Sequence, residues 1–300
     1  RITVSRALLS NPQLVARDTR LKIEAAANAL GYVPNLAASA LSGKKSGIIA
    51  ALVSTLGDAY FTKMMEGMQN AFQGTGLQLL VGDMRYDPDN EVALLRRVLG
   101  RQPEGLVITA GDHSDEAIRL LKRTRIPIIE AWDLPEDPIH SSIGFDNYEG
   151  GVLVAEHFLR CGYRQPVYVA QALNPAEGLT EKRALGRWHG FRDTLRTRAG
   201  LDPRLVLSDE PGTYEAGAQI MEQLIAPGLK ADAIFFVFDI WAVGAVYQCQ
   251  RQGVNVPEQL GISGFGDVPI SSAMVPRLTT VRIAIEDLGM LVGQTMIRML

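Results

Sequence analysis

From Ile48 onward the sequence alternates short apolar runs with helical patterns, and this rhythm restricts the fold more than any other feature. The apolar runs are Ile48–Val53, Leu77–Val81, Gly105–Thr109 and Ile126–Ala131, and helical patterns lie near residues 60–73, 90–99 and 114–123. Short apolar runs separated by helices are typical of a parallel sheet covered on both faces. The pattern therefore predicts an α/β fold for this part of the chain.

The same rhythm resumes after Asn147 and provides a second set of elements. Strands are expected near residues 166–170, 204–207, 232–238 and 260–264, and helices near 148–160, 181–198, 214–225 and 240–252. That is enough for two sheets of similar size, each in its own subdomain. The last apolar run, Leu278–Ile283, and the helix from Ile285 to Leu300 need not belong to the second sheet.

The first 33 residues have a different, all-helical pattern. A helix over Thr3–Leu9 places Val4, Ala7 and Leu8 on one face, and a second helix runs from about Ala16 to Leu30. Two helices of this size bury too little apolar surface to fold alone. We therefore expect a further segment before Arg1.

Between these parts, residues 31–47 form a junction that is more than a tether. Pro34 and Asn35 are a helix start signal, and Gly43 is a stop signal about two turns later. So short a helix is marginal on its own because helix nucleation is costly. A segment that can be helical or not is a candidate switch.

Charge is distributed unevenly along the chain. Residues 1–46 hold seven basic and two acidic residues, or +5, so the remainder of a chain with net charge −3 carries −8. Such asymmetry suggests that the small end binds a polyanion. Solvated surface lysines and arginines without a partner remain the alternative.

The sequence lacks the signatures of several other classes. Cys161 and Cys249 have no metal or redox spacing, and no apolar run is long enough for a membrane span. We find no G-x-S-x-G elbow, no complete phosphate loop and no histidine pair for zinc. A cytoplasmic protein that is not an enzyme and needs no cofactor or metal is expected.

Several blocks resemble the lactose-repressor (LacI/GalR) family of bacterial transcription regulators, over essentially the whole chain. They are Thr3–Leu8, Leu30–Asn35, Ala38–Leu41, Ala59–Phe61, Gly144–Asn147, Arg187–Phe191, Asp239 with Ala242–Gly244, Gly264–Asp267 and Pro276–Val281. The resemblance implies a two-subdomain sensor like periplasmic binding proteins, preceded by an all-α helix-turn-helix DNA-binding headpiece that is incomplete here. It also implies that the first headpiece helix lies before Arg1 and that a final stretch follows Leu300.

The resemblance assigns DNA contacts to two segments. Arg1, Ile2, Ser5 and Arg6 match the exposed face of the recognition helix, which reads base edges in the major groove. In the hinge helix the matching positions are Asn35, Ala38 and Leu41, with Leu41 as the apolar wedge that kinks the minor groove. An ordinary buried leucine is the alternative for Leu41. The implied DNA partner is a near-palindromic operator bound by a homodimer, or by a tetramer.

The resemblance also divides the chain into domains. Residues 1–33 are the headpiece, 34–46 the hinge, and 47–300 the effector-binding domain. Its first subdomain would comprise about 47–145 plus 277–300 and its second about 147–275, with crossings near Asp146–Asn147 and Ala273–Pro276 and a third beyond Leu300.

Ligands of such folds bind at the carboxyl ends of the strands, in the cleft between the subdomains. Carried over by position, the effector-binding candidates are Tyr60, Phe61, Trp132, Arg187, Phe238, Asp239, Gly266 and Asp267. Arg187 is the strongest, because a guanidinium grips carboxylates or vicinal oxygens with a fixed fork of donors. A solvated arginine is its alternative reading. His113 and Glu130 could lie near the cleft or be ordinary loop and strand residues.

Two departures from the family pattern point to an anionic effector. Phe238 stands where many members have asparagine, and Gly266 stands where many have an acid. Fewer carboxylates around a retained arginine suit an anion. The segments Ile126–Asp133, Gly144–Asn147 and Cys249–Gly253 also resemble the gluconate-type branch. The prediction is a repressor of carbohydrate or sugar-acid catabolism genes controlled by gluconate or a ketogluconate; the alternative is a sugar-binding transport component.

Overall fold

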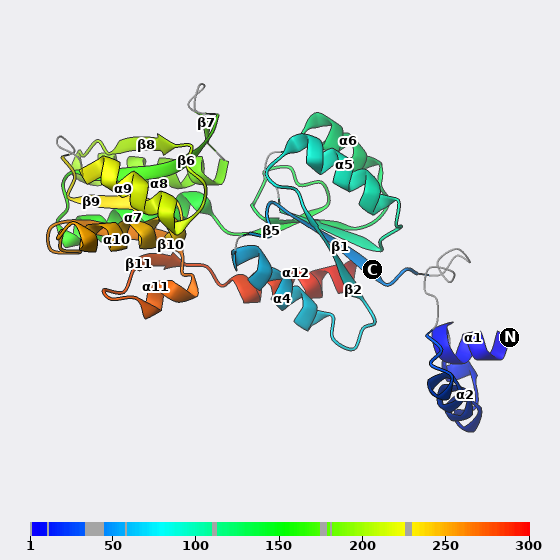
Figure 1. Ribbon diagram of the computed structural model, residues 1–300. Helices are drawn as coiled ribbons and strands as arrows, with labels where there is room; N and C mark the ends of the chain where they lie inside the picture. Colours follow the sequence, from blue (N-terminus) through cyan, green and yellow to red (C-terminus); the bar gives the residue numbers. More distant parts are fainter. Residues whose placement is uncertain are drawn as a thin grey trace.

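The computed structural model contains a small helical N-terminal part and two α/β lobes (Figure 1). The residues that it describes are 2–10, 12–33, 45–57, 59–109, 113–174, 179–180, 182–225 and 230–300. Arg1 and residues 34–44, which include the predicted hinge helix, lie outside the described residues.

The N-terminal part follows the predicted helices and leaves part of their apolar surface exposed. Its elements are α1 (Ile2–Ser5), the π-helical turn η1 (Arg6–Ser10), the short 3-10 turn η2 (Pro12–Leu14) and α2 (Arg17–Ala29). Ala7 and Val15 are buried, whereas Val4 is 42% and Leu30 82% exposed. Val4 and Leu30 are therefore left uncovered by the described helices, which offer too little surface to bury them.

The first lobe is a five-stranded parallel sheet with the order β2-β1-β3-β4-β5. Its elements are β1 (Ile48–Val53), α4 (Ala59–Ala71), β2 (Gln78–Asp83), α5 (Pro88–Leu99), β3 (Gly105–Ile108), α6 (Asp115–Arg123), β4 (Ile128–Trp132) and β5 (Ser141–Gly144). The predicted strands and helices are confirmed. β5 was not predicted, since its residues are short and half-buried and lack an apolar run.

The second lobe is also built on a parallel sheet, with the order β11-β10-β9-β6 and β8 paired to β6. Its elements are α7 (Asn147–Cys161), β6 (Pro166–Asn174), β7 (Leu179–Thr180), α8 (Lys182–Ala199), β8 (Arg204–Ser208), α9 (Tyr214–Ile225), β9 (Ala233–Phe236), α10 (Asp239–Arg251), β10 (Gly261–Gly266), α11 (Pro269–Ala273) and β11 (Thr279–Arg282). The short β7 pairs antiparallel with the end of β6. The α/β fold with two parallel sheets flanked by helices is thus confirmed.

The chain passes between the lobes at two places. It leaves the first lobe between β5 and α7, and it returns between β11 and α12 (Ile285–Met299), which packs against α4 (Figure 1). Because Thr279 pairs with Ser263, β11 belongs to the second sheet. The prediction of a crossing near Ala273–Pro276, with residues from 277 onward in the first lobe, therefore places the return too early. Phe145 and Ile283, at the two passages, pack against the buried clusters of both lobes.

Helices α7 and α8 cross in close contact. A Cβ at Gly190 would overlap the carbonyl oxygen of Tyr148, and one at Gly151 would overlap that of Arg187. Glycine at both positions lets the two backbones approach, and the approach fixes α8 and its side chains over the second sheet. Within the described part of the chain, none of the helices has the length and apolar character needed to cross a membrane.

Candidate ligand-binding site

A cavity of about 570 Å³ lies where the carboxyl ends of the strands of both lobes meet. The first lobe lines it with Thr55, Gly57, Tyr60, Phe61, Tyr86 and Trp132; the second lobe and the second passage contribute Gln171, Ala172, Arg183, Ala184, Arg187, Pro211, Gly212, Thr213, Val237, Phe238, Ile240, Phe265 and Ile283. Five predicted effector residues therefore converge here: Tyr60, Phe61, Trp132, Arg187 and Phe238. The volume suits a single small molecule.

Arg187 is held rigidly on α8 at the wall of the cavity. Its side chain is 7% exposed, Nε donates to Asn147 Oδ1 (3.1 Å), and Nη1 donates to the carbonyl oxygen of Val237. The guanidinium carbon lies 4.2 Å from the centre of the Phe265 ring. These contacts fix the guanidinium plane and use two of its five N–H groups, so the remaining donors can serve a ligand.

Burial lowers the pKa of Arg187, and nearby Arg183 lowers it further, while Tyr168, Tyr60 and Asp133 act in the opposite direction. An arginine stays protonated even so. A buried cation is destabilised by the loss of water around it, and an anion beside it relieves that cost. The site is thus electrostatically prepared for a negative group.

Arg183 is a second cavity arginine that the sequence analysis missed. It is 5% exposed, and its Nε lies 3.7 Å from Asp133 Oδ2 of the first lobe. It precedes Arg187 by four residues on α8, so both side chains lie on one helix face. That spacing was the available signal, because any second arginine four positions away shares the face of the first.

The first lobe contributes an aromatic wall. The ring centroids of Phe61 and Trp132 are 4.9 Å apart, and those of Trp132 and Phe145 are 5.6 Å apart. Trp132 has a backbone φ of 87°, a left-handed conformation that is rare for a bulky residue and is often found at ligand sites. Ring faces of this kind pack well against the C–H faces of a sugar.

Tyr60 connects the lobes at one side of the cavity. Its hydroxyl donates to the carbonyl oxygen of Phe265 (2.9 Å), so a first-lobe helix is tied to β10 of the second lobe. A Cβ at Gly266 would overlap the Tyr60 ring, and Gly266 has a φ of 126°. The departure from the family acid at Gly266 therefore has a steric reason: the Tyr60 ring occupies the space that a side chain there would fill.

Asp239 and Asp267 do not line the cavity. The Asp239 carboxylate is fully buried behind it and accepts hydrogen bonds from Val268 N (2.9 Å), Ser271 Oγ (3.0 Å) and Thr280 Oγ1 (2.6 Å). Burial raises the pKa of Asp239 despite these donors. Asp267 pairs with the exposed Arg282. In this structure Asp239 joins β10, α11 and β11, which is a framework role and not ligand contact.

The two further candidates also lie outside the cavity lining. Glu130 accepts a hydrogen bond from Ile139 N at 2.6 Å, as an ordinary strand residue. His113 Nδ1 lies 2.5 Å from Glu91 Oε1, and both side chains are buried. The described residues hold no group of three or more His, Cys, Asp and Glu side chains arranged for a metal ion.

Three of the seven residues predicted to contact DNA belong to the described part of the chain. Arg6 is exposed, and Ile2 and Ser5 belong to α1. Arg1, Asn35, Ala38 and Leu41 lie outside the described residues, so their roles stay predictions.

Two parallel-sheet lobes joined by two passages around a small-molecule cavity define a sensor of the periplasmic-binding type. In agreement, residues 155–300 match the profile of a "Periplasmic binding protein-like domain", and residues 1–35 match that of "Bacterial regulatory proteins, lacI family". The chain is 35% identical to the "HTH-type transcriptional regulator GntR" of Pseudomonas aeruginosa over 96% of its own length and 82% of that protein. The chain belongs to the LacI family of DNA-binding transcriptional regulators.

Solved structures of regulators share this fold over nearly the whole chain. A LacI family regulator from Silicibacter pomeroyi superposes with a TM-score of 0.87 at 26% identity, covering 99% of this chain and 87% of that one. The Lac repressor dimer bound to operator and the anti-inducer ONPF gives a TM-score of 0.85 at 25% identity, with 99% and 88% covered. The lacI-type N-terminus disfavours the alternative of a transport component.

Proposed function

We propose that the cavity binds a sugar acid such as gluconate or a ketogluconate, and that this ligand controls repression of sugar-acid catabolism genes. The observation that carries the proposal is the pair of buried arginines, Arg183 and Arg187, on one face of α8. Among the lining residues that the structure describes, none is Asp or Glu.

The charge balance favours a single negative group. Arg183 and Arg187 contribute +2, and Asp133 lies beside Arg183 and offsets one charge, which leaves about one cation to neutralise. A monocarboxylate beside Arg187 supplies that charge and can accept two parallel N–H bonds from a guanidinium. A neutral sugar would leave the buried cation without compensation.

The remaining lining suits a polyol chain. Thr55, Gln171 and Thr213 offer hydroxyl and amide groups, while Phe61, Trp132 and Phe238 provide apolar surface. Phe238, which replaces the family asparagine, exchanges a hydrogen-bonding group for a ring. This exchange favours apolar contact with the ligand's carbon chain on that side.

The control of DNA binding would follow from lobe closure. A ligand between Arg187 of the second lobe and Trp132 of the first stabilises one lobe arrangement, and a coupling of about 1–3 kcal/mol to the DNA-bound state is enough for regulation. By family resemblance, a cytoplasmic homodimer, or a tetramer, would bind a near-palindromic operator, with Arg1, Ile2, Ser5 and Arg6 in the major groove.

Isothermal titration calorimetry of the regulator with gluconate, ketogluconate and glucose tests the ligand class. We expect binding of at least one sugar acid and none, or much weaker binding, of glucose. Exclusive binding of the neutral hexose would refute the proposal. A gel shift on duplex selected by the protein from a random pool, with and without the bound acid, then shows the direction of control.

The hinge is tested separately by Leu41→Ala. If Leu41 wedges into the minor groove, this variant weakens operator binding and leaves sugar-acid affinity nearly unchanged. Equal loss of both affinities would show that Leu41 is a structural residue.

A further inference from the structure

The surface of the first lobe is strongly polarised. Residues 93–103 and 117–129 contain seven basic and no acidic residues. All seven are exposed: Arg96, Arg97, Arg101, Arg119, Lys122, Arg123 and Arg125. Acidic residues gather instead at the other end of the same sheet, in Asp83, Asp87, Asp89 and Asp133. An exposed single-sign surface of this size on a chain of net charge −3 calls for a partner.

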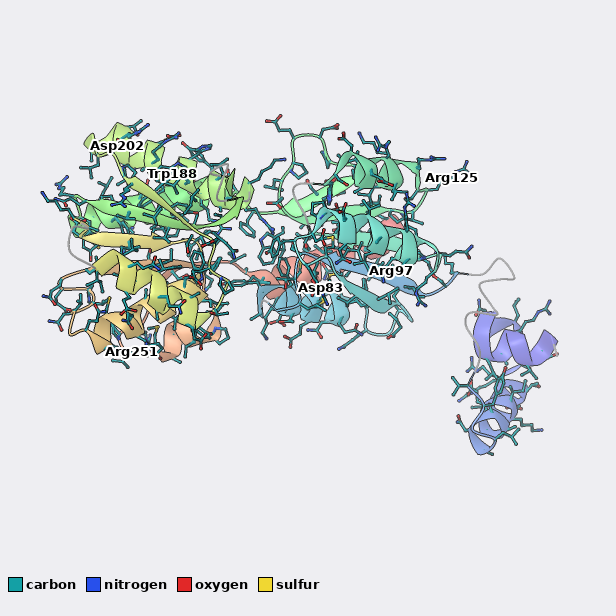
Figure 2. The ribbon with its side chains drawn as sticks, turned by 45° about the horizontal axis from the view of Figure 1, so that its top comes forward. Asp83, Arg97, Arg125, Trp188, Asp202 and Arg251 are labelled. Atoms are coloured by element: carbon teal, nitrogen blue, oxygen red, sulfur yellow. The ribbon has the colours of Figure 1, made fainter. Side chains whose placement is uncertain are left out.

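The topology of the lobe brings the basic residues to one edge. Arg101 stands four residues before β3 and Arg125 three before β4, and these strands are parallel neighbours. α5 and α6 run back toward the same edge and end with Arg97 and Arg123 in their last turns. We call this set, Arg97, Arg101, Lys122, Arg123 and Arg125, the basic edge. Figure 2 shows Arg97 and Arg125 on this lobe, toward the side of the N-terminal helices.

The connection to the DNA-binding helices starts from this same edge. β1 lies next to β3 and begins at Ile48, directly after Gly47 and three residues after Lys45. Gly47 N donates to Glu104 Oε1 (2.6 Å), and Lys45 Nζ lies 3.6 Å from Glu104 Oε2, so the chain is fixed where it enters the lobe. The eleven intervening residues 34–44 span at most roughly 40 Å, and less if they form the predicted helix.

Helix electrostatics explain a part of this basic edge but not all of it. Basic residues in the last turns of α5 and α6 are favoured by the helix dipole, which accounts for Arg97, Lys122 and Arg123. Arg101 and Arg125 lie beyond the ends of these helices. Arg96 is paired with Glu116 and is not counted in the basic edge.

We propose that the basic edge faces the phosphate backbone of the DNA held by the N-terminal helices and adds affinity that is independent of sequence. The proposal rests on DNA binding by the family and extends it to the sensor lobe. Arginine and lysine near phosphates release counterions, so their contribution decreases steeply with salt concentration. Ligand-driven movement of the lobe would then change a DNA contact directly as well as through the hinge.

The test compares two triple variants of the full-length regulator. Arg97→Gln with Arg101→Gln and Arg125→Gln neutralises the basic edge. Arg164→Gln with Arg204→Gln and Arg251→Gln is the matched control: it removes the same charge from exposed positions on the second lobe, where Arg164 and Arg204 stand at the start of β6 and β8. Both sets are exposed, and sugar-acid affinity and melting temperature verify that the variants are folded.

Fluorescence anisotropy is measured with a duplex of about 40 base pairs, selected from a random pool by the wild-type protein, and with a random duplex of equal length, between about 50 and 200 mM KCl. We expect the first-lobe variant to bind both duplexes more weakly and to reduce the salt slope by at least about 1, with the control unchanged.

Equal slopes for the wild type and the first-lobe variant would overturn the proposal, and so would an equal change in the control, which would indicate net charge alone. If DNA slopes are unchanged but binding of poly-L-glutamate is lost, the basic edge serves an acidic protein and the proposal is wrong. If sugar acids do not change operator binding by the wild-type protein, the proposed ligand is wrong. The comparison of salt slopes still decides whether the basic edge contacts DNA.

Discussion

The two lobes share one architecture but give the cavity different chemistry. In both, the lining comes from the carboxyl ends of parallel strands and from the loops and helices that follow them. The second lobe supplies both cavity arginines, Arg183 and Arg187, beside its rings Phe238 and Phe265. The first lobe supplies aromatic rings, Phe61 and Trp132 among them, and no charged side chain to the described lining. Under the proposed function, this difference would orient the sugar acid, with its carboxylate toward the arginines of the second lobe and its carbon chain toward the rings of the first. Side-chain choice, and not topology, therefore decides the ligand class.

Arg187→Gln provides the most severe test of this asymmetry. Each hydrogen bond from a charged donor contributes about 1.5–3 kcal/mol, so the loss of two bonds to a carboxylate lowers sugar-acid affinity by about 100-fold or more. Calorimetry measures the loss. Arg192→Gln on the same helix is the control, because Arg192 pairs with Asp193 and lies outside the cavity lining. An equal loss in both variants would contradict the special role of Arg187.

Asp239→Asn tests whether the framework of the second lobe depends on its buried carboxylate. Oδ2 accepts from both Val268 N and Ser271 Oγ, and an amide nitrogen at that position would face the Val268 donor. We expect the free energy of unfolding to fall by about 1–3 kcal/mol in denaturant titrations at neutral pH. Asp267→Asn, which breaks the exposed pair with Arg282, should change it by less than about 1 kcal/mol. Similar losses of stability in the two variants would show that the buried Asp239 stabilises the lobe no more than the Asp267 surface pair does.

Trp132→Phe examines the aromatic wall of the first lobe. The smaller ring loses stacking area but keeps the Phe61 contact, so sugar-acid affinity should fall by about 2- to 10-fold, corresponding to roughly 0.5–1.5 kcal/mol. Calorimetry again measures it. A loss of affinity as large as that of Arg187→Gln would show that Trp132 and Arg187 contribute equally to ligand binding. The proposed difference between the two lobes would then be wrong.

The smallest expected effect is a pH dependence from Asp239. Because burial raises its pKa above the usual 3.8, the folded protein binds more protons than the unfolded chain as pH rises from 3.8 toward the raised value. The contribution of this group to stability therefore decreases with rising pH in that window. Denaturant titrations across the window should show a shallower decline for Asp239→Asn than for the wild type, whereas parallel curves would contradict the assigned shift.

Most of the fold was predictable because central strands such as β1, β3, β4 and β9 are buried and are therefore apolar runs in the sequence. The elements that were missed, β5, β7 and α11, are short or polar, so composition gives no signal for them. The second passage was misplaced because β11 has an apolar pattern that fits either sheet. Its pairing with β10 is a tertiary choice that the sequence does not reveal.

The site was predictable through family positions, but only in part. Phe238 and Asp239 are neighbours, yet one lines the cavity and the other lies behind it, because the start of α10 turns their side chains in different directions. The family resemblance had assigned both Phe238 and Asp239 to ligand binding. Arg183 was missed for the opposite reason: it matches no quoted family motif, and its pairing with Asp133 of the first lobe is a tertiary contact that the sequence does not reveal.

The two passages also have a consequence for engineering. The chain enters the second lobe after Phe145 and leaves it at Ile283, and every described strand of the second sheet lies between these two points. If the corresponding stretch of a relative replaced this one, the chimera would gain the relative's cavity side chains from the second lobe and keep its own DNA-binding helices. The stretch between Phe145 and Ile283 is then the segment to exchange, and receptors for new metabolites could be assembled by exchange instead of by redesign of the cavity.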